Sequence, residues 1–142
     1  MRESLVEAQA AAGGSIAHDV SVPVSRIPEF IERADAAVEA ACSGIRRCAF
    51  GHVGDGNMHY NPIKPLQLDR AAFREQRAPI NRVVHDIVAD LAGSISAEHG
   101  IGRSRLAELE HYKARIELDM MRSLKRALDP NGIMNPGKML RG

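Results

Sequence analysis

The chain has 142 residues, 44% of them hydrophobic, and a formal net charge of +1 at pH 7, so we expect a folded protein with a buried core. The near-neutral charge and the absence of Trp argue against a nucleic-acid partner. No apolar run reaches the roughly 18 residues of a membrane span, and Cys42 and Cys48 are not spaced as a CxxC motif, which is typical of reduced thiols in a cytoplasmic protein.

Helical and extended patterns alternate in the first part of the chain. A helix over about residues 1–12 should end at Gly13-Gly14, and residues 16–22 resemble a short strand. Apolar residues at helical spacing then predict a helix over about residues 27–41.

The pattern continues with residues 46–53 and 58–63, which we expect to be two strands of a hairpin. A helix is predicted over about residues 79–91, and residues 94–97 form a short strand. The resulting order, βαββαβ, predicts an α+β protein of the ferredoxin-like kind, with one antiparallel sheet and its helices on one face.

Two portions follow from this order. Residues 1–102 should hold the sheet, and residues 103–142 should form a C-terminal helical segment and an extended tail. Within that segment, six apolar residues at helical spacing are candidate core positions: Leu106, Leu109, Ile116, Met120, Leu124 and Leu128.

The predicted hairpin places two histidines together. Asp-Gly favours a two-residue turn, so if Asp55-Gly56 forms the loop, His52 faces His59, and Asn61 lies opposite Phe50 on the same face. Opposed residues have Cβ atoms about 4.5–5.5 Å apart, which suits two imidazoles that bind one metal ion. The alternative for any strand histidine is a hydrogen-bonded structural role.

A Glu-His pair supplies further chemistry at the end of the last predicted strand. Glu98 is a candidate third metal ligand, and His99, which should point elsewhere, is a candidate base. Two His and one carboxylate also occur in metal-dependent hydrolases, although the helical HExxH motif is absent here. A third reading is a ferredoxin-like binding module without catalysis.

Three motifs occur in the order GHVGDGNMHYN, SISAEHGIG and LDPNGIMNPGKML, and an HDVSVP segment precedes them. Together they resemble the C-terminal domain of FAD-linked oxidases, a family that includes D-lactate and D-2-hydroxyglutarate dehydrogenases and a glycolate oxidase subunit. The resemblance implies a divalent-metal site, often zinc in this family, with His52, His59 and Glu98 as ligands. It also implies that His99 is the catalytic base.

The same resemblance implies contacts to substrate and cofactor. Arg2 and Asn61 match residues that bind substrate, and Asn135, in the third motif, is assigned to binding FAD. The family often has a substrate-binding lysine where this chain has Ala17, which argues against a dicarboxylate substrate.

The glycine-rich loop with which the family binds FAD, in an N-terminal domain, has no counterpart in this sequence. We therefore expect a fragment or subunit that is inactive alone and requires an N-terminal flavin-binding domain as its partner. In the larger protein, a small D-2-hydroxy acid would be oxidised to a 2-oxo acid by hydride transfer to FAD. Without that partner, residues 103–142 should expose apolar side chains and favour a homo-oligomer, through some of Ile133, Met134, Met139 and Leu140.

Overall fold

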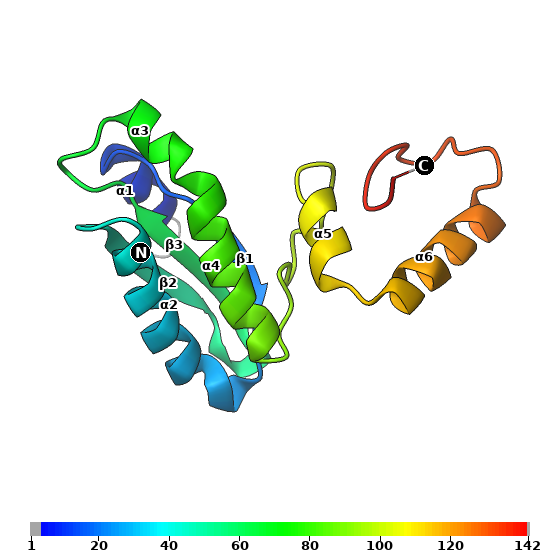
Figure 1. Cartoon of the computed structure of the whole chain (residues 1–142), viewed down its shortest axis with the longest axis horizontal. Coiled ribbons are helices and arrows are strands. Elements are labelled where there is room, and N and C mark those ends of the chain that lie inside the picture. Colours follow the sequence, from blue (N-terminus) through cyan, green and yellow to red (C-terminus); the bar gives the residue numbers. More distant parts are fainter. Residues whose placement is uncertain (1–3, 142) are drawn as a thin grey trace. The chain divides into compact units, whose positions relative to one another are not determined.

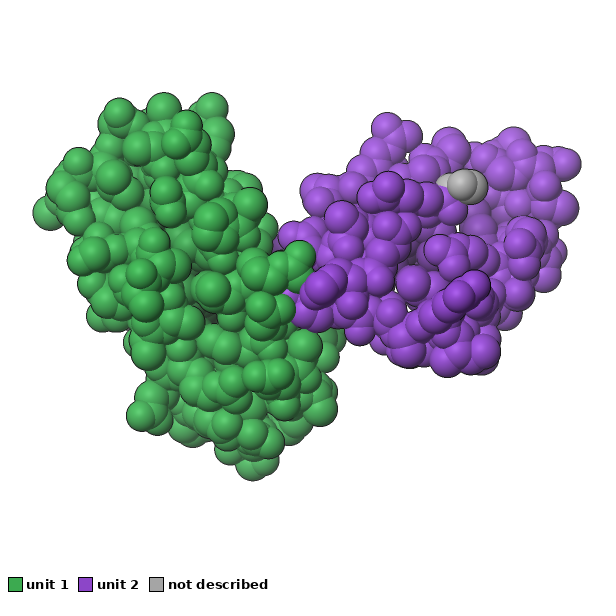
Figure 2. Space-filling view, viewed as in Figure 1, with its two compact units in different colours: residues 1–98 green, residues 99–142 purple. Residues whose placement is uncertain are grey.

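The computed structural model describes residues 4–141 and divides the chain into two compact units, residues 1–98 and residues 99–142 (Figure 2). The first unit contains the predicted alternation of helices and strands. Its helices and strands are α1 (Ser4–Ala11), β1 (His18–Ser21), α2 (Ile27–Ala41), β2 (Arg46–His52), β3 (Asn57–Ile63), α3 (Arg70–Glu75) and α4 (Arg77–Asp90).

The sheet is antiparallel, with three strands in the order β1-β3-β2. The prediction of an α+β protein is confirmed. Residues 94–97, predicted as a fourth strand, contribute only one bridge, between Ser94 and Ser21 at the free edge of β1. The Ser94 hydroxyl bonds locally to the backbone of Ser96, and such local bonds compete with strand pairing.

One face of the sheet is covered by α2 and α4, which pack side by side (Figure 1). The ring of Tyr60 on β3 lies 5.6 Å from that of Phe30 on α2, and the Tyr60 hydroxyl donates to Asp35 at 2.8 Å. Burial, together with this bond, raises the pKa of Tyr60 far above its usual value. His18 on β1 meets His85 on α4, with ring centroids 5.5 Å apart. The two helices of the predicted βαββαβ pattern, α2 and α4, therefore share one face as predicted, whereas α1 contacts the other face through Gln9, which bonds to Asn61 and Cys48.

The second unit contains α5 (Leu106–Tyr112) and α6 (Arg115–Leu128). Leu109 is buried as predicted. Four predicted core residues of α6 are instead exposed, with exposed fractions of 67% for Ile116, 61% for Met120, 62% for Leu124 and 76% for Leu128. The helical spacing was read correctly, but a unit this small has too few elements to cover an apolar stripe on every helix.

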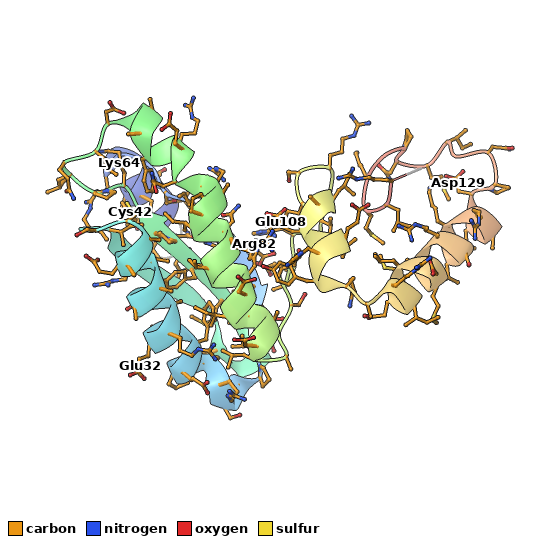
Figure 3. The ribbon with its side chains drawn as sticks, viewed as in Figure 1. Glu32, Cys42, Lys64, Arg82, Glu108 and Asp129 are labelled. Carbon is orange, nitrogen blue, oxygen red and sulfur yellow. The ribbon has the colours of Figure 1, made fainter. Side chains whose placement is uncertain are left out.

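The tail after α6 is held by Asp129, labelled in Figure 3. Its carboxylate accepts the backbone N–H groups of Ile133 and Met134 and pairs with Lys125. The predicted exposure of apolar tail residues is confirmed for Ile133, Met134 and Met139. Among residues 4–141, no helix is both long and apolar enough to cross a membrane.

Candidate metal and substrate site

The loop between β2 and β3 has four residues rather than the predicted two. A short 3-10 turn over Val53–Asp55 leads into Gly56, which has a φ of 72°. A Cβ on Gly56 would lie 2.2 Å from the Val22 carbonyl oxygen, so only glycine fits there. The two-residue turn requires positive φ at both Asp55 and Gly56, and of these two only Gly56 has it. The predicted turn type was wrong.

The longer loop shifts the strand pairing by two residues. His52 faces Asn57, and His59 faces Phe50, so the predicted pairs of His52 with His59 and of Asn61 with Phe50 were wrong. Because side chains alternate with a period of two, a shift of two keeps every residue on its face. His52, His59 and Asn61 therefore still share the face opposite α2 and α4, where His52 and His59 are diagonal neighbours.

A close polar contact on this face joins His59 to Glu98. The His59 Nε2 atom lies 3.1 Å from Glu98 Oε1, and the exposed fractions of the two side chains are 14% and 42%. Two ligand atoms bound at about 2.0–2.1 Å to a tetrahedral zinc ion are roughly 3.3 Å apart. The distance between His59 Nε2 and Glu98 Oε1 therefore suits a direct hydrogen bond, and it also suits two ligand atoms that bind the same divalent ion.

Asp19 supports both members of this pair. It faces His59 across the sheet and is 3% exposed, and its Oδ1 atom lies 3.8 Å from His59 Nδ1. Its Oδ2 atom accepts the backbone N–H of Glu98 at 3.1 Å, and its carbonyl accepts that of Ala97 at 3.1 Å. A carboxylate behind the second ring nitrogen of a ligand histidine is a common feature of metal sites, because it orients the ring.

Asp19 was not among the predicted site residues, although the alternation of β1 gave one signal for it. His18 and Val20 are buried against the helices, and strand alternation turns the carboxylate between them to the opposite face. The pairing of Asp19 with His59 could not be predicted from a turn, because β1 and β3 are joined through α2 and β2 rather than by a hairpin.

Asn61 is buried, and both polar atoms of its amide form hydrogen bonds. Its Oδ1 atom accepts the backbone N–H of His18 at 3.3 Å, and its Nδ2 atom donates to Gln9 Oε1 at 2.9 Å. The same Gln9 oxygen accepts from the Ser15 hydroxyl at 3.0 Å. This network ties α1 to the sheet. The substrate contact predicted for Asn61 stays a prediction.

The other predicted site residues are distributed along the chain. His99 is exposed and is the first residue of the second unit. Asn135 lies in the tail with a φ of 49°, and its Oδ1 atom accepts from Lys138 Nζ at 3.1 Å. Arg2 lies outside the described residues. The roles of these three, and of His52, His59 and Glu98 as metal ligands, stay predictions.

Comparison with known proteins gives a consistent result. The family model described as FAD linked oxidases, C-terminal domain, matches residues 1–139. A D-2-hydroxyglutarate dehydrogenase of Stutzerimonas stutzeri is 41% identical over 122 residues, which are 86% of this chain and 26% of that protein. A D-lactate dehydrogenase of Archaeoglobus fulgidus is 35% identical over 123 residues, or 87% of this chain and 26% of that protein.

A mitochondrial D-2-hydroxyglutarate dehydrogenase of Bos taurus is 34% identical over 140 residues. The match covers 99% of this chain and 24% of the bovine protein. The chain therefore spans about a quarter of the length of the curated relatives it matches.

Proposed function

Since the chain belongs to the family of FAD linked oxidases, as their C-terminal domain, we propose that it supplies the substrate site of a dehydrogenase that oxidises a D-2-hydroxy acid to a 2-oxo acid. The contact that carries this proposal is the one between His59 and Glu98, backed by the buried Asp19. His59 lies in the GHVGDGNMHYN motif, Glu98 in the SISAEHGIG motif and Asp19 in the HDVSVP segment, all of which indicated the family.

The donor set on this face of the sheet suits a divalent ion such as zinc. His59 and Glu98 would be two ligands, and His52, which shares the face of His59, would be the third. Asp19 would keep the His59 ring in place from its Nδ1 side. When bound, such an ion supplies Lewis-acid chemistry that orients a hydroxy acid and lowers the pKa of its hydroxyl.

The remaining chemistry is divided between this chain and the flavin. His99, directly after Glu98, would accept the hydroxyl proton, and FAD, held mainly by an N-terminal domain, would supply the hydride acceptor. Asn61 and Arg2 would contact the substrate, and Asn135 the cofactor. The family assignment favours this reading over a metal-dependent hydrolase or a binding module without catalysis. We also propose a cytoplasmic location.

The test is flavin reduction in this chain joined to, or co-expressed with, a family flavin-binding domain. Rapid mixing with D-lactate or D-2-hydroxyglutarate should bleach the flavin, and the L-enantiomers should not. His99→Asn should slow the reduction roughly 10²–10⁴-fold, because a positioned base contributes about that much. His111→Asn is the matched control, since His111 is also exposed in the second unit and contacts Tyr112 edge-to-face. Reduction of the His99→Asn enzyme at the parent rate would show that His99 is not the base.

A second pair of variants separates the ligand from the base. Glu98→Gln should weaken metal binding, so excess metal should restore part of its rate. His99→Asn should retain the metal and gain nothing from added metal. If added metal rescued both variants equally, the division of roles between Glu98 and His99 would be wrong.

A further inference from the structure

A pocket of about 320 Å³ lies in the first unit, and none of its described lining residues is assigned to the proposed reaction. It is bounded by the end of α1 and the following loop on one side, and by α3 and the start of α4 on the other. Three of its lining side chains are arginines, namely Arg70, Arg74 and Arg77, and no acidic residue lines it within the described part of the chain.

The arginines point to the same side because of their spacing. Positions i, i+4 and i+7 fall on one face of a helix and extend over roughly 10 Å at 1.5 Å per residue. The backbone passes from α3 to α4 at Gln76, which keeps helical dihedral angles (φ −73°, ψ −8°). Phe73 lies between Arg70 and Arg74 in the sequence. Its side chain is buried and lines the same pocket.

These three arginines lack ionic partners, unlike other arginines of the same unit. Within residues 4–141, none of the three forms an ion pair, whereas Arg26 and Arg33 both pair with Glu29. The nearby cation Lys64, labelled in Figure 3, is already engaged, because its ammonium donates to the carbonyls of Pro65 and Leu68. In the part of the chain that the structure describes, the pocket therefore carries three positive charges that have no ion-pair partner.

The opposite wall brings the backbone close to this charge. Gly13 and Gly14 have φ angles of 107° and 93°, and a Cβ on Gly13 would lie 2.6 Å from the Lys64 side chain. Gly14 has open space where a Cβ would be. The Lys64 side chain thus fills the space beside Gly13, and the open space beside Gly14 leaves room for a ligand opposite the guanidinium groups.

We propose that this pocket binds a small phosphate-bearing anion with at least two negative charges. Guanidinium groups bind phosphate oxygens in a bidentate manner, and two or three of them spaced along a helix match an anion with more than one charged group. The volume lies at the lower end of the range of small-molecule sites, about 300–1,000 Å³. The site is independent of the proposed dehydrogenase reaction.

The experiment is a calorimetric titration of the full chain with inorganic pyrophosphate at constant ionic strength. We expect saturable binding of one ligand, weakened at least tenfold in Arg70→Gln/Arg74→Gln/Arg77→Gln. The control, Arg115→Gln/Arg122→Gln/Arg126→Gln on α6, removes the same charge and should bind within twofold of the parent. Absence of saturable binding, or an equal loss in the control, would overturn the proposal.

A single-site variant and a titration with ADP complete the test. If the triple variant does not fold by circular dichroism, Arg74→Gln alone should still weaken binding about threefold or more, and unchanged affinity there would overturn the proposal. Titration with ADP then distinguishes the source of the phosphate. Tighter binding of ADP than of pyrophosphate would indicate a nucleotide, and weaker binding a free anion, and both results support a phosphate site.

Discussion

Asp19 accepts the backbone N–H of Glu98 at 3.1 Å, although 79 positions separate the two residues in the sequence. This bond fixes the segment that carries Glu98 next to the strand that faces His59. Asp19→Ala should therefore weaken divalent-metal binding roughly 10–100-fold, the usual effect of losing a residue that supports metal ligands. Competition with a chromophoric chelator measures the affinity without any need for flavin.

The matched control for this prediction is Asp35→Ala. Asp35 accepts a hydrogen bond from Tyr60 on the helix-covered face of the same sheet, so its loss should lower the free energy of unfolding by about 1 kcal/mol and leave metal affinity unchanged. Asp19→Asn should fall between the parent and Asp19→Ala, because an amide oxygen still accepts the Glu98 N–H. Equal metal affinity in Asp19→Ala and the parent would refute the positioning role.

The local parts of the fold could be predicted from the sequence, and the non-local parts could not. Apolar spacing was enough for α2 and α4, and strand alternation placed His59 and Asn61 on the correct face even though the loop length was wrong. The contact of Asp19 with Glu98 depends on pairing between segments that no single turn connects. Such pairing leaves no short-range sequence pattern from which it could be predicted.

Burial in the second unit shows the same limit. The spacing of Met120 and Leu124 correctly indicated an amphipathic helix, but the pattern cannot say whether another element covers its apolar stripe. In the first unit, the sheet covers the equivalent stripe of α2. Prediction of a core position therefore requires knowledge of the packing partner as well as of the spacing.

The anchor of the tail should be sensitive to acid. The hydrogen bond from Lys125 holds the pKa of Asp129 below its ordinary value of 3.8, and the N–H groups of Met134 and Ile133 add to the effect. Stability from this lowered pKa is present above about pH 4 and is lost as the pH falls through the folded-state value. In NMR spectra, the amide shifts of Ile133 and Met134 should titrate below pH 3.8, and Asp129→Asn should abolish the transition. A midpoint at or above 3.8 would contradict this assignment.

The exposed stripe of α6 should drive self-association of the isolated chain. Met120 and Leu124 are 61% and 62% exposed, and apolar patches of this kind favour contacts between molecules. Sedimentation should show a mass that rises with concentration, and Met120→Ser/Leu124→Ser should shift the chain towards the monomer. Val6→Ser, at a single apolar residue of α1 that is 67% exposed, should leave the association unchanged. A parent chain that is monomeric at all concentrations would rule this out.

The most direct test of the candidate site is the metal content of the purified chain. We predict about one divalent ion per chain after loading and desalting, measured by elemental analysis. His52→Ala/His59→Ala should lose the ion, whereas His85→Ala/His111→Ala, which removes one histidine from α4 and one from α5, should retain it. A stoichiometric ion that survives in His52→Ala/His59→Ala would contradict the site proposed here.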